Sequence, residues 1–333
     1  MSPANRCQRL ARCRIAVAVL SAVAAGAAGC GGSHTAAGGG PNETHLTVAA
    51  VTATDEIPLW LAQQDGFFRQ QGLNVTVQPV TTGSLAIPSL VSGRIDVLAG
   101  GNYVTLLDGQ ANGTFNIRVI APAASCTADD FSVLALPHSG ITKPSDLAGK
   151  TVSVPATSSV ATILIGAQLR HHGVNPASVH YVAIPFVDAS TALQAHRVAA
   201  ISAIEPFLSE AEAAGAQPVM SLCTGPTAGL PLSGDFATAS WAQAHPRAAA
   251  AFARAVAEGA AAAARNPGAV KKVLAAHIKL PASTAAVVHF NGYPTSLDAA
   301  QVQRVADLML TGGLLKSRLH IAPLLVQNGK AAG

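Results

Sequence analysis

Glycine, hydroxyl and amide side chains gather in short stretches that suit ligand binding rather than covalent chemistry. The clearest are Thr81-Thr82-Gly83-Ser84 and Gly100-Gly101-Asn102-Tyr103, each between an expected strand and an expected helix. In a parallel sheet, ligands bind beyond the carboxyl ends of the strands, where helix N-termini offer free N–H groups. The sequence contains no Gly-x-Ser-x-Gly, His-Glu-x-x-His or Walker motif, so no enzyme class is indicated. The neighbouring His171 and His172 diverge on a helix and do not form a metal pair.

The elements that must position these residues form an expected βαβ unit. Residues 74–80 alternate between polar and apolar side chains as a half-buried strand does. Residues 85–92 have one apolar helical face, and residues 95–99 are a short buried strand. The stretches 81–84 and 100–103 are then the two loops that follow strands.

Length and composition predict an ordered, globular chain that is long enough for two lobes. Of its 333 residues, 50% are hydrophobic and 11% are charged. Four arginines, Arg6, Arg9, Arg12 and Arg14, account for the formal charge of +4. Without them 17 basic residues face 17 acidic ones, since 21 minus 4 is 17. A neutral remainder gives no indication of nucleic-acid binding.

The N-terminus resembles a bacterial lipoprotein signal peptide. An arginine-rich start is followed by the apolar run 15–25 and by Ala27-Ala28-Gly29-Cys30. The apolar run is shorter than the ~20 residues that cross a bilayer. The resemblance implies cleavage after residue 29, lipidation of Cys30 and a flexible tether up to residue 45.

Two of the five cysteines, Cys126 and Cys223, remain once the signal segment and Cys30 are set aside. In an exported chain, two remaining cysteines suggest one disulfide. A pair of free, buried thiols is the alternative.

Four short motifs occur in an order that is similar to the first lobe of ABC-importer substrate-binding proteins. The resemblance is to the branch for sulfonates, taurine, nitrate and thiamine-pyrimidine precursors. The motifs are Pro58-Leu59-Trp60-Leu61-Ala62, Gly66-Phe67-Phe68, Gly72-Leu73-Asn74-Val75 and Ser92-Gly93-Arg94-Ile95-Asp96-Val97. Residues 146–152 resemble the start of that family's second lobe, and Glu205-Pro206 matches its Glu-Pro pair. The Gly, Asp and aromatic residues that often precede this pair are absent from residues 194–204.

This resemblance implies an α/β fold of the periplasmic-binding-protein type II kind, with two lobes and a ligand cleft between them. We expect residues 46–124 and 225–333 to form the first lobe and residues 125–224 the second. Cys126 and Cys223 would then lie on the two crossing segments, where a disulfide would join them. The implied partners are a small molecule and the permease and ATPase subunits of an importer, with the chain a membrane-anchored monomer without a cofactor.

Other classes with this fold fit the sequence less well. Thiamine-pyrimidine synthases carry a Cys-rich motif that is missing here, and LysR-type regulators carry a helix-turn-helix where this chain has an export signal. A surface lipoprotein without a ligand would not need six polar stretches after strands.

The second lobe repeats the pattern of a strand followed by a polar stretch. Ser158 and Ser159 follow the expected strand 151–155, and their hydroxyls either cap the next helix or meet a ligand. Asp188 is expected to cap a helix over residues 189–197. Residues 223–236 read as a glycine- and proline-rich return to the first lobe.

The ligand prediction depends on charge. The stretches 52–58, 81–84, 100–103, 156–159, 185–188 and 204–206 contain no Lys or Arg, but they contain Asp55, Glu56, Asp188 and Glu205. A monoanionic sulfonate held by hydroxyls and helix N-termini is therefore favoured over a phosphate, and over a thiamine pyrimidine. Glu205 either pairs a ligand nitrogen, with Tyr103 or Phe186 stacking, or is a residue at a helix start. The predicted ligand contacts are Gly83, Ser84, Asn102, Tyr103, Ser158, Ser159 and Glu205.

Overall fold

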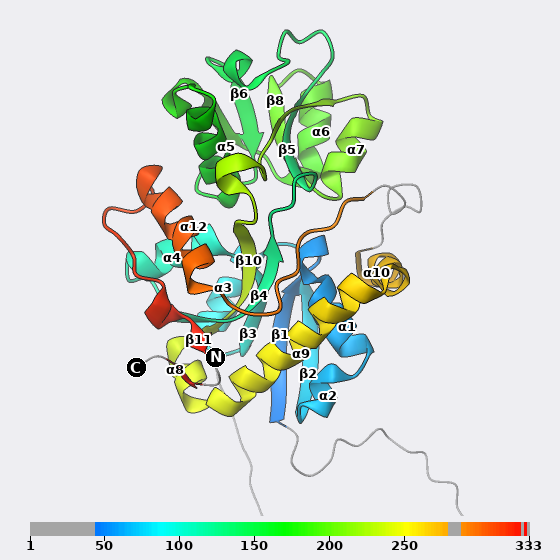
Figure 1. The fold of residues 1–333 in the computed structure, drawn as a ribbon, viewed down its shortest axis with the longest axis vertical. Helices are drawn as coiled ribbons and strands as arrows, with labels where there is room; N and C mark the ends of the chain where they lie inside the picture. Colours follow the sequence, from blue (N-terminus) through cyan, green and yellow to red (C-terminus); the bar gives the residue numbers. More distant parts are fainter. Residues whose placement is uncertain (1–43, 279–287, 328–329, 332–333) are drawn as a thin grey trace, which may run out of the picture. The chain divides into compact units, whose positions relative to one another are not determined.

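A computed structural model describes residues 44–278, 288–327 and 330–331. The signal-like segment and Cys30 therefore lie outside the described residues. The described strands form two five-stranded sheets and one two-stranded hairpin (Figure 1). The chain is thus an α/β protein with two lobes, each built on one five-stranded sheet, as the sequence predicts.

The first sheet has the strand order β2-β1-β3-β10-β4. β1 pairs in parallel with β2 and β3, whereas β10 runs antiparallel between β3 and β4. A strand from the returning chain therefore completes the sheet. The strands are β1 Thr44–Val51, β2 Leu73–Val80, β3 Val97–Asn102, β4 Ile117–Ser125 and β10 Pro231–Thr238.

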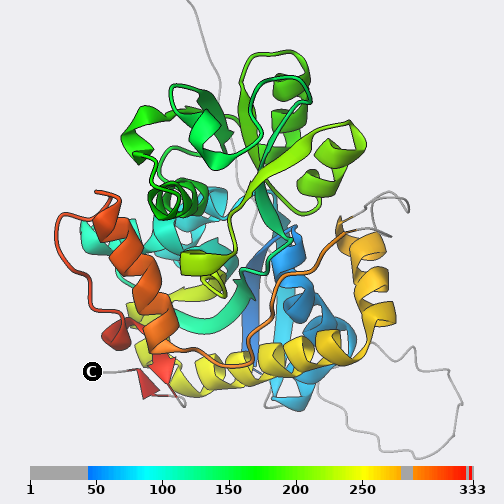
Figure 2. The same cartoon turned by 45° about the horizontal axis from the view of Figure 1, so that its top comes forward.

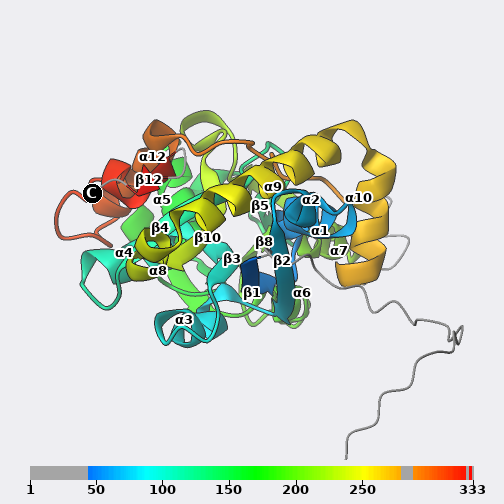
Figure 3. The same cartoon turned by 90° about the horizontal axis from the view of Figure 1, so that it is seen from below.

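Both faces of the first sheet are covered by helices, as a sheet with parallel strands requires. Successive side chains of a strand point to opposite faces, so Val48 and Ala50 of β1 join one apolar core while Ala49 joins another. The first core contains α1 and α9, which crosses the strands β1 and β2 (Figures 1 and 2). The second contains α3, α4 and α12, and Figure 3 shows α3 across the sheet from α1. The helical elements are η1 Thr54–Glu56, α1 Ile57–Gln64, α2 Phe67–Gln70, α3 Gly83–Val91, α4 Tyr103–Ala111, α8 Ala239–Ala244, α9 Pro246–Arg265, α10 Pro267–Val273, η5 Leu274–Ile278, α12 Ala299–Thr311 and η6 Ala322–Leu324.

The second sheet has the order β7-β6-β8-β5-β9, in which β6 is parallel to β7 and β8 while β5 is antiparallel to β8 and β9. This repeats the arrangement of the first sheet, with an antiparallel strand beside three parallel ones. The remaining short hairpin is β11 Val326–Gln327 and β12 Lys330–Ala331. The elements of the second lobe are β5 Phe131–Ala135, η2 Pro144–Leu147, β6 Thr151–Val154, α5 Val160–His171, η3 Pro176–Ser178, β7 His180–Ala183, α6 Phe186–Gln194, β8 Ala200–Ile204, α7 Phe207–Ala213 and β9 Gln217–Ser221. The short helix η4 Gly225–Thr227 follows in the returning segment.

The expected βαβ unit is present as β2, α3 and β3, but its second loop is not. Gly100, Gly101 and Asn102 belong to strand β3, and Tyr103 is the first residue of α4. The prediction of a loop over residues 100–103 was therefore wrong. It took the glycine pair as the end of the strand, but glycine is tolerated within a strand where other groups approach the backbone closely.

The segment 223–236 returns to the first lobe as expected, but it also contains most of strand β10, a central strand of the first sheet that was not predicted. One expectation about the second lobe was wrong. Asp188 does not cap a helix, because α6 begins at Phe186 and places Asp188 in its first turn. An acid in the first turn is stabilised by the helix dipole without being a cap.

Among the helices within the described ranges, none combines the length and apolar character of a membrane span.

Candidate functional site

The junction between β3 and α4 holds two of the predicted ligand contacts. Asn102 Oδ1 accepts hydrogen bonds from Val104 N at 2.9 Å and Thr105 N at 3.4 Å, so this oxygen caps α4. Tyr103 is fully buried, and its ring lies edge-on to Phe236 with ring centroids 5.4 Å apart. Its hydroxyl has no hydrogen-bond partner. Tyr103 is thus held in place by its ring, with its polar end unused.

Three carboxylates from two separate segments converge beside this tyrosine. Asp55 and Glu56 follow β1, and Asp235 lies in β10. Asp55 Oδ2 accepts from Ser233 Oγ at 2.6 Å, and Asp235 Oδ1 accepts from Gly100 N at 3.2 Å. The second oxygens, Asp55 Oδ1 and Asp235 Oδ2, are buried without a partner, and so is Glu56 Oε1. We call Asp55, Glu56, Asp235 and Tyr103 the acid cluster.

Two glycines allow the acid cluster to form. Gly100 has a φ of +73°, and a Cβ there would lie 2.8 Å from Glu56 Oε1. A Cβ on Gly234 would lie 2.6 Å from the Tyr103 hydroxyl. Any other residue at either position would push a polar side chain out of the cluster. The glycines that interrupt the apolar patterns of β3 and β10 therefore serve this close approach.

Because these acids are buried and no cationic side chain pairs with them, their pKa values are raised. Desolvation raises the pKa of Asp55, and it raises the pKa of Glu56 well above its usual range, with the charges of Asp235 and Asp55 adding to the effect. Desolvation raises the pKa of Asp235 to about 8, and the hydrogen bond from Gly100 N opposes this by lowering the pKa. The Tyr103 pKa also rises through burial and the charge of Asp235. No Lys or Arg of the described segments forms an ion pair with these carboxylates.

These shifts predict that the unliganded protein loses stability as the pH rises from about 4 to 8. A folded-state pKa above the unfolded value of 3.8 means that folding favours the protonated form of Asp235. That contribution is complete below about pH 4 and disappears as the pH rises through about 8. Calorimetry should show a melting temperature that falls across this range. Asp235→Asn should flatten this fall, and Asp129→Asn, at an exposed acid, should not. An unchanged slope in Asp235→Asn would contradict the assignment.

Two of the helix N-termini that were predicted to lie at the ligand site have no side-chain cap. At α3 the N-cap residue Thr82 makes no capping bond, and at α5 Ser159 makes none. Gly83 begins α3, and a Cβ on it would lie 3.5 Å from Gly101 Cα, so this helix starts beside the end of β3. Ser84 and Ser158 are exposed, whereas Ser159 is buried with an unpartnered Oγ. First-turn N–H groups of both helices are therefore available to an anion.

Glu205 is at a helix start, and its carboxylate is fully engaged within the protein. Its oxygens accept from Ser209 Oγ at 2.8 Å and Ser209 N at 3.3 Å, at the start of α7. They also contact His289, with N at 3.2 Å and Nδ1 at 3.1 Å. Glu205 thus ties α7 to the returning chain around residue 289.

Asp130 is a buried acid that the sequence analysis did not single out. Desolvation raises its pKa to about 7, with a smaller contribution from the charge of Asp55. Its Oδ2 accepts from Thr127 N at 3.0 Å and Asn291 Nδ2 at 3.1 Å, and its Oδ1 lies 3.1 Å from Cys223 Sγ. Cys126, Asp130 and Cys223 come close enough to hold a metal, but both sulfurs are used in a disulfide. Asp130 therefore lies at the crossing between the lobes.

The predicted disulfide is confirmed. Cys126 and Cys223 have their Cα atoms 5.1 Å apart and are joined through sulfur. Cys126 directly follows β4, and Cys223 is the second residue after β9. The bond therefore joins the segments that leave and re-enter the first lobe.

The structure brings Gly83, Asn102 and Tyr103 to one edge of the first sheet, together with Asp55 and Glu56. Sequence reasoning missed Asp235 and Ser233, since both lie in the glycine- and proline-rich return, where no strand was predicted. An acid between apolar residues in the run Pro231–Thr238 was the available signal. Whether Gly83, Ser84, Asn102, Tyr103, Ser158, Ser159 and Glu205 touch ligand stays a prediction.

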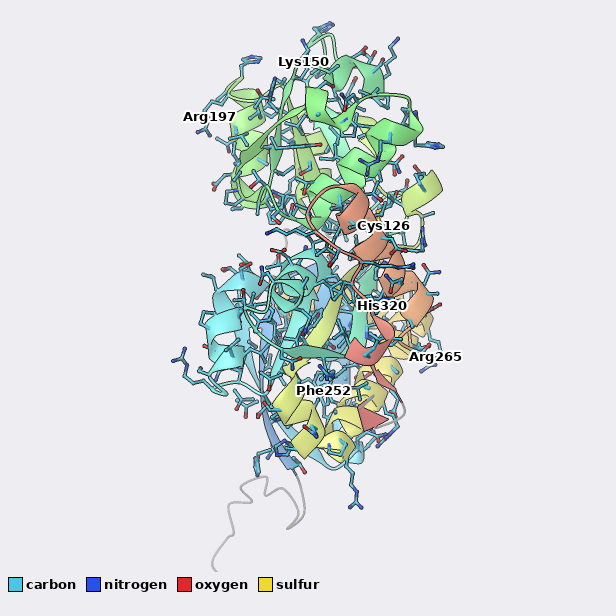
Figure 4. All side chains as sticks on the ribbon, turned by 90° about the vertical axis from the view of Figure 1, so that its left-hand side faces the viewer. Cys126, Lys150, Arg197, Phe252, Arg265 and His320 are labelled. Atoms are coloured by element: carbon cyan, nitrogen blue, oxygen red, sulfur yellow. A yellow bond between two sulfur atoms is a disulfide. The ribbon has the colours of Figure 1, made fainter. Side chains whose placement is uncertain are left out.

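Two cavities lie away from the acid cluster. One of about 510 Å³ is lined in part by Lys150 and Arg197, which Figure 4 shows at the far end of the second lobe from Cys126. Another of about 420 Å³ lies between α5 and the end of α12 and includes Thr157 and Tyr181. Neither lining includes a residue of the acid cluster.

Comparison with solved structures places this fold among periplasmic binding proteins. The periplasmic aliphatic sulphonate binding protein SsuA from Escherichia coli superposes with a TM-score of 0.71 at 19% identity, covering 85% of this chain and 98% of that one. The alkanesulfonate-binding protein SsuA from Xanthomonas axonopodis pv. citri, bound to MOPS, gives the same score and coverages at 21% identity. The desulfurization enzyme DSZB gives 0.66 at 17%, with 85% and 97% covered. The fold thus carries both binding proteins and an enzyme.

Sequence comparison identifies the family. No curated protein sequence matches this chain significantly. A family model described as NMT1/THI5 like matches residues 53–270, which is more than half of the chain and includes η1, β3, α5, Glu205 and β10. The chain therefore belongs to the NMT1/THI5-like family.

Proposed function

We propose that this protein is the extracytoplasmic solute-binding component of an ABC importer. In this role it captures a small organic solute between its two lobes and presents it to a membrane permease with its ATPase subunits, acting as a monomer. The fold that it shares with sulfonate-binding periplasmic proteins supports the proposal. Sulfonates, including taurine-like compounds, are the favoured ligands.

The observation that carries this ligand class is the pair of uncapped helix N-termini. α3 in the first lobe and α5 in the second both follow parallel strands and both lack a side-chain cap. A monoanion shared by two such N-termini gains ~0.3 to 1 kcal/mol from each dipole and needs no cationic side chain. The hydroxyls of Ser84, Ser158 and Ser159 would add hydrogen bonds. Binding by both lobes would also close them over the ligand by a hinge motion.

A thermal-shift panel tests this function directly. Alkanesulfonates, taurine, nitrate, pyrimidines, phosphate esters and metal ions are each added to the purified protein. A true ligand at 100 times its Kd adds ~2.7 kcal/mol of stability. Stabilisation by a sulfonate, with loss of growth on that sulfonate as sole sulfur source when the gene is deleted, is the expected result. If only phosphate esters or metals stabilise the protein, the sulfonate assignment is wrong.

Lipidation of Cys30 predicts that the mature protein remains with the membrane. The Cys30→Ala form should be released, or remain as the uncleaved precursor, because the thiol that takes the lipid is missing. Fractionation and metabolic labelling with a fatty acid measure this. Cys13→Ala, in the expected signal segment, is the matched control and should stay anchored. Lipid labelling of the Cys30→Ala protein would contradict the anchor.

A further inference from the structure

The acid cluster gathers buried carboxyl groups that no Lys or Arg of the described residues pairs with. Asp235 and Glu56 are at most 1% exposed, and Asp55 is the partly exposed member of the cluster. One oxygen of each lacks a hydrogen-bond partner. A buried polar group without a partner carries the full cost of its desolvation, so three together need an explanation.

The Tyr103 hydroxyl is independent evidence that the acid cluster lacks a hydrogen-bonding partner. It is 0% exposed and unpartnered, and it lies against the backbone of Gly234 next to Asp235. Buried tyrosine hydroxyls ordinarily find a partner. A phenol can accept one hydrogen bond from a ligand while donating another to a carboxylate. The tyrosine and the acids therefore point to a hydrogen-bond donor that carries positive charge.

The spacing of the acids favours an organic cation over a metal ion. Within the described residues, the set of three potential metal ligands whose atoms lie within 4.8 Å of one another is Cys126, Asp130 and Cys223, not the acid cluster. Metal ions hold oxygen ligands at ~2.0 to 2.6 Å and so require closely spaced oxygens. An ammonium group reaches its acceptors at ~2.7 to 2.9 Å and tolerates a wider arrangement.

We propose that Asp55, Glu56, Asp235 and Tyr103 form a subsite for a protonated amine of the transported solute. This inference rests on the proposed function and narrows its substrate class to zwitterions that carry an amine and a sulfonate. A solute amine would reach Asp55 first, because it is the one residue of these four that is partly exposed. The sulfonate end is then left for the α3 N-terminus beside Gly101 and for α5.

Taurine and ethanesulfonate are the matched probes, since they differ only in the amine, and ethylammonium isolates the amine. Calorimetric titration should give taurine an affinity at least about tenfold higher than ethanesulfonate, which corresponds to ~1.4 kcal/mol. Asp55→Asn should remove that advantage and leave the ethanesulfonate affinity unchanged or improved. Asp129→Asn, an exposed acid, should change neither affinity. Taurine affinity should also rise from pH 6 to pH 8, because the amine favours the ionised acids.

The outcomes separate the subsite from the proposed function. If ethanesulfonate binds as tightly as taurine, or if Asp55→Asn weakens both alike, the amine subsite is refuted while sulfonate binding stands. If ethylammonium binds and Asp55→Asn abolishes its binding but neither sulfonate binds, the subsite stands and the sulfonate function fails. If none of the three probes binds, both are refuted. Glu56 and Asp235 would then be acids that share a proton within the fold.

Discussion

Replacing both Cys126 and Cys223 by serine lowers the free energy of unfolding by about 2 to 4 kcal/mol. The bond closes a loop with a sequence separation of 97 residues, which contains the entire second sheet. Closing so long a loop restricts the unfolded chain strongly, and chain entropy alone allows about 4.7 kcal/mol for 100 residues. Both residues are buried, at 4% and 2% exposure, so the lost packing adds to the effect. Urea unfolding of the oxidised, reduced and double-serine proteins measures it.

The two single-serine variants provide a control for this test. Cys126→Ser and Cys223→Ser should each resemble the reduced wild type rather than add to each other, because either one removes the same bond. Wild-type protein that shows the same stability with and without a reductant would contradict a stabilising bond. Alkylation of two free thiols in unreduced, unfolded protein would show that the bond does not form.

Gly259→Ala should destabilise the protein by about 1 to 3 kcal/mol or more, the usual cost of overpacking a core. Gly259 lies in α9, where a Cβ would stand 2.0 Å from Pro58 O and 3.2 Å from Ala62 N of α1. These neighbours are backbone atoms of a helix, so they cannot move aside as a side chain would. In an open helix position, alanine is more favourable than glycine by about 0.5 to 1 kcal/mol. The glycine is therefore explained by the close approach of the two helices.

Gly166→Ala in α5 is the matched control. A Cβ there would meet the Arg170 guanidinium at 3.6 Å and Pro176 Cβ at 3.9 Å, which are ordinary contacts. We expect this variant to be unchanged or more stable by about 0.5 to 1 kcal/mol. Because α1 directly follows Asp55 and Glu56, Gly259→Ala should also weaken solute binding, whereas Gly166→Ala in the other lobe should not act through those acids. Equal stability of the two variants would contradict the packing argument.

Much of the fold could be predicted from local pattern. The alternation in residues 74–80 and the apolar face of residues 85–92 are present as β2 and α3. The cysteine pair was predictable because only two cysteines remain beyond the expected lipidation site. These signals are local or compositional, so they can be recognised without knowing how the segments pack. Helix starts were less predictable, as Asp188 shows, since several polar residues near a helix start are equally plausible caps.

The sequence by itself determined the fold class, two α/β lobes, and it predicted a site of polar residues at strand ends with acids that lack matching cations. Only the tertiary structure decided which of these residues meet. Strand β10 enters between β3 and β4 after more than a hundred intervening residues, and no local pattern specifies that pairing. Its insertion sets Asp235 against Gly100 and brings Gly234 to the Tyr103 hydroxyl. In the same way His289 reaches Glu205 from the returning chain. Such contacts depend on how distant segments pack, and the preferences of each segment leave that packing open.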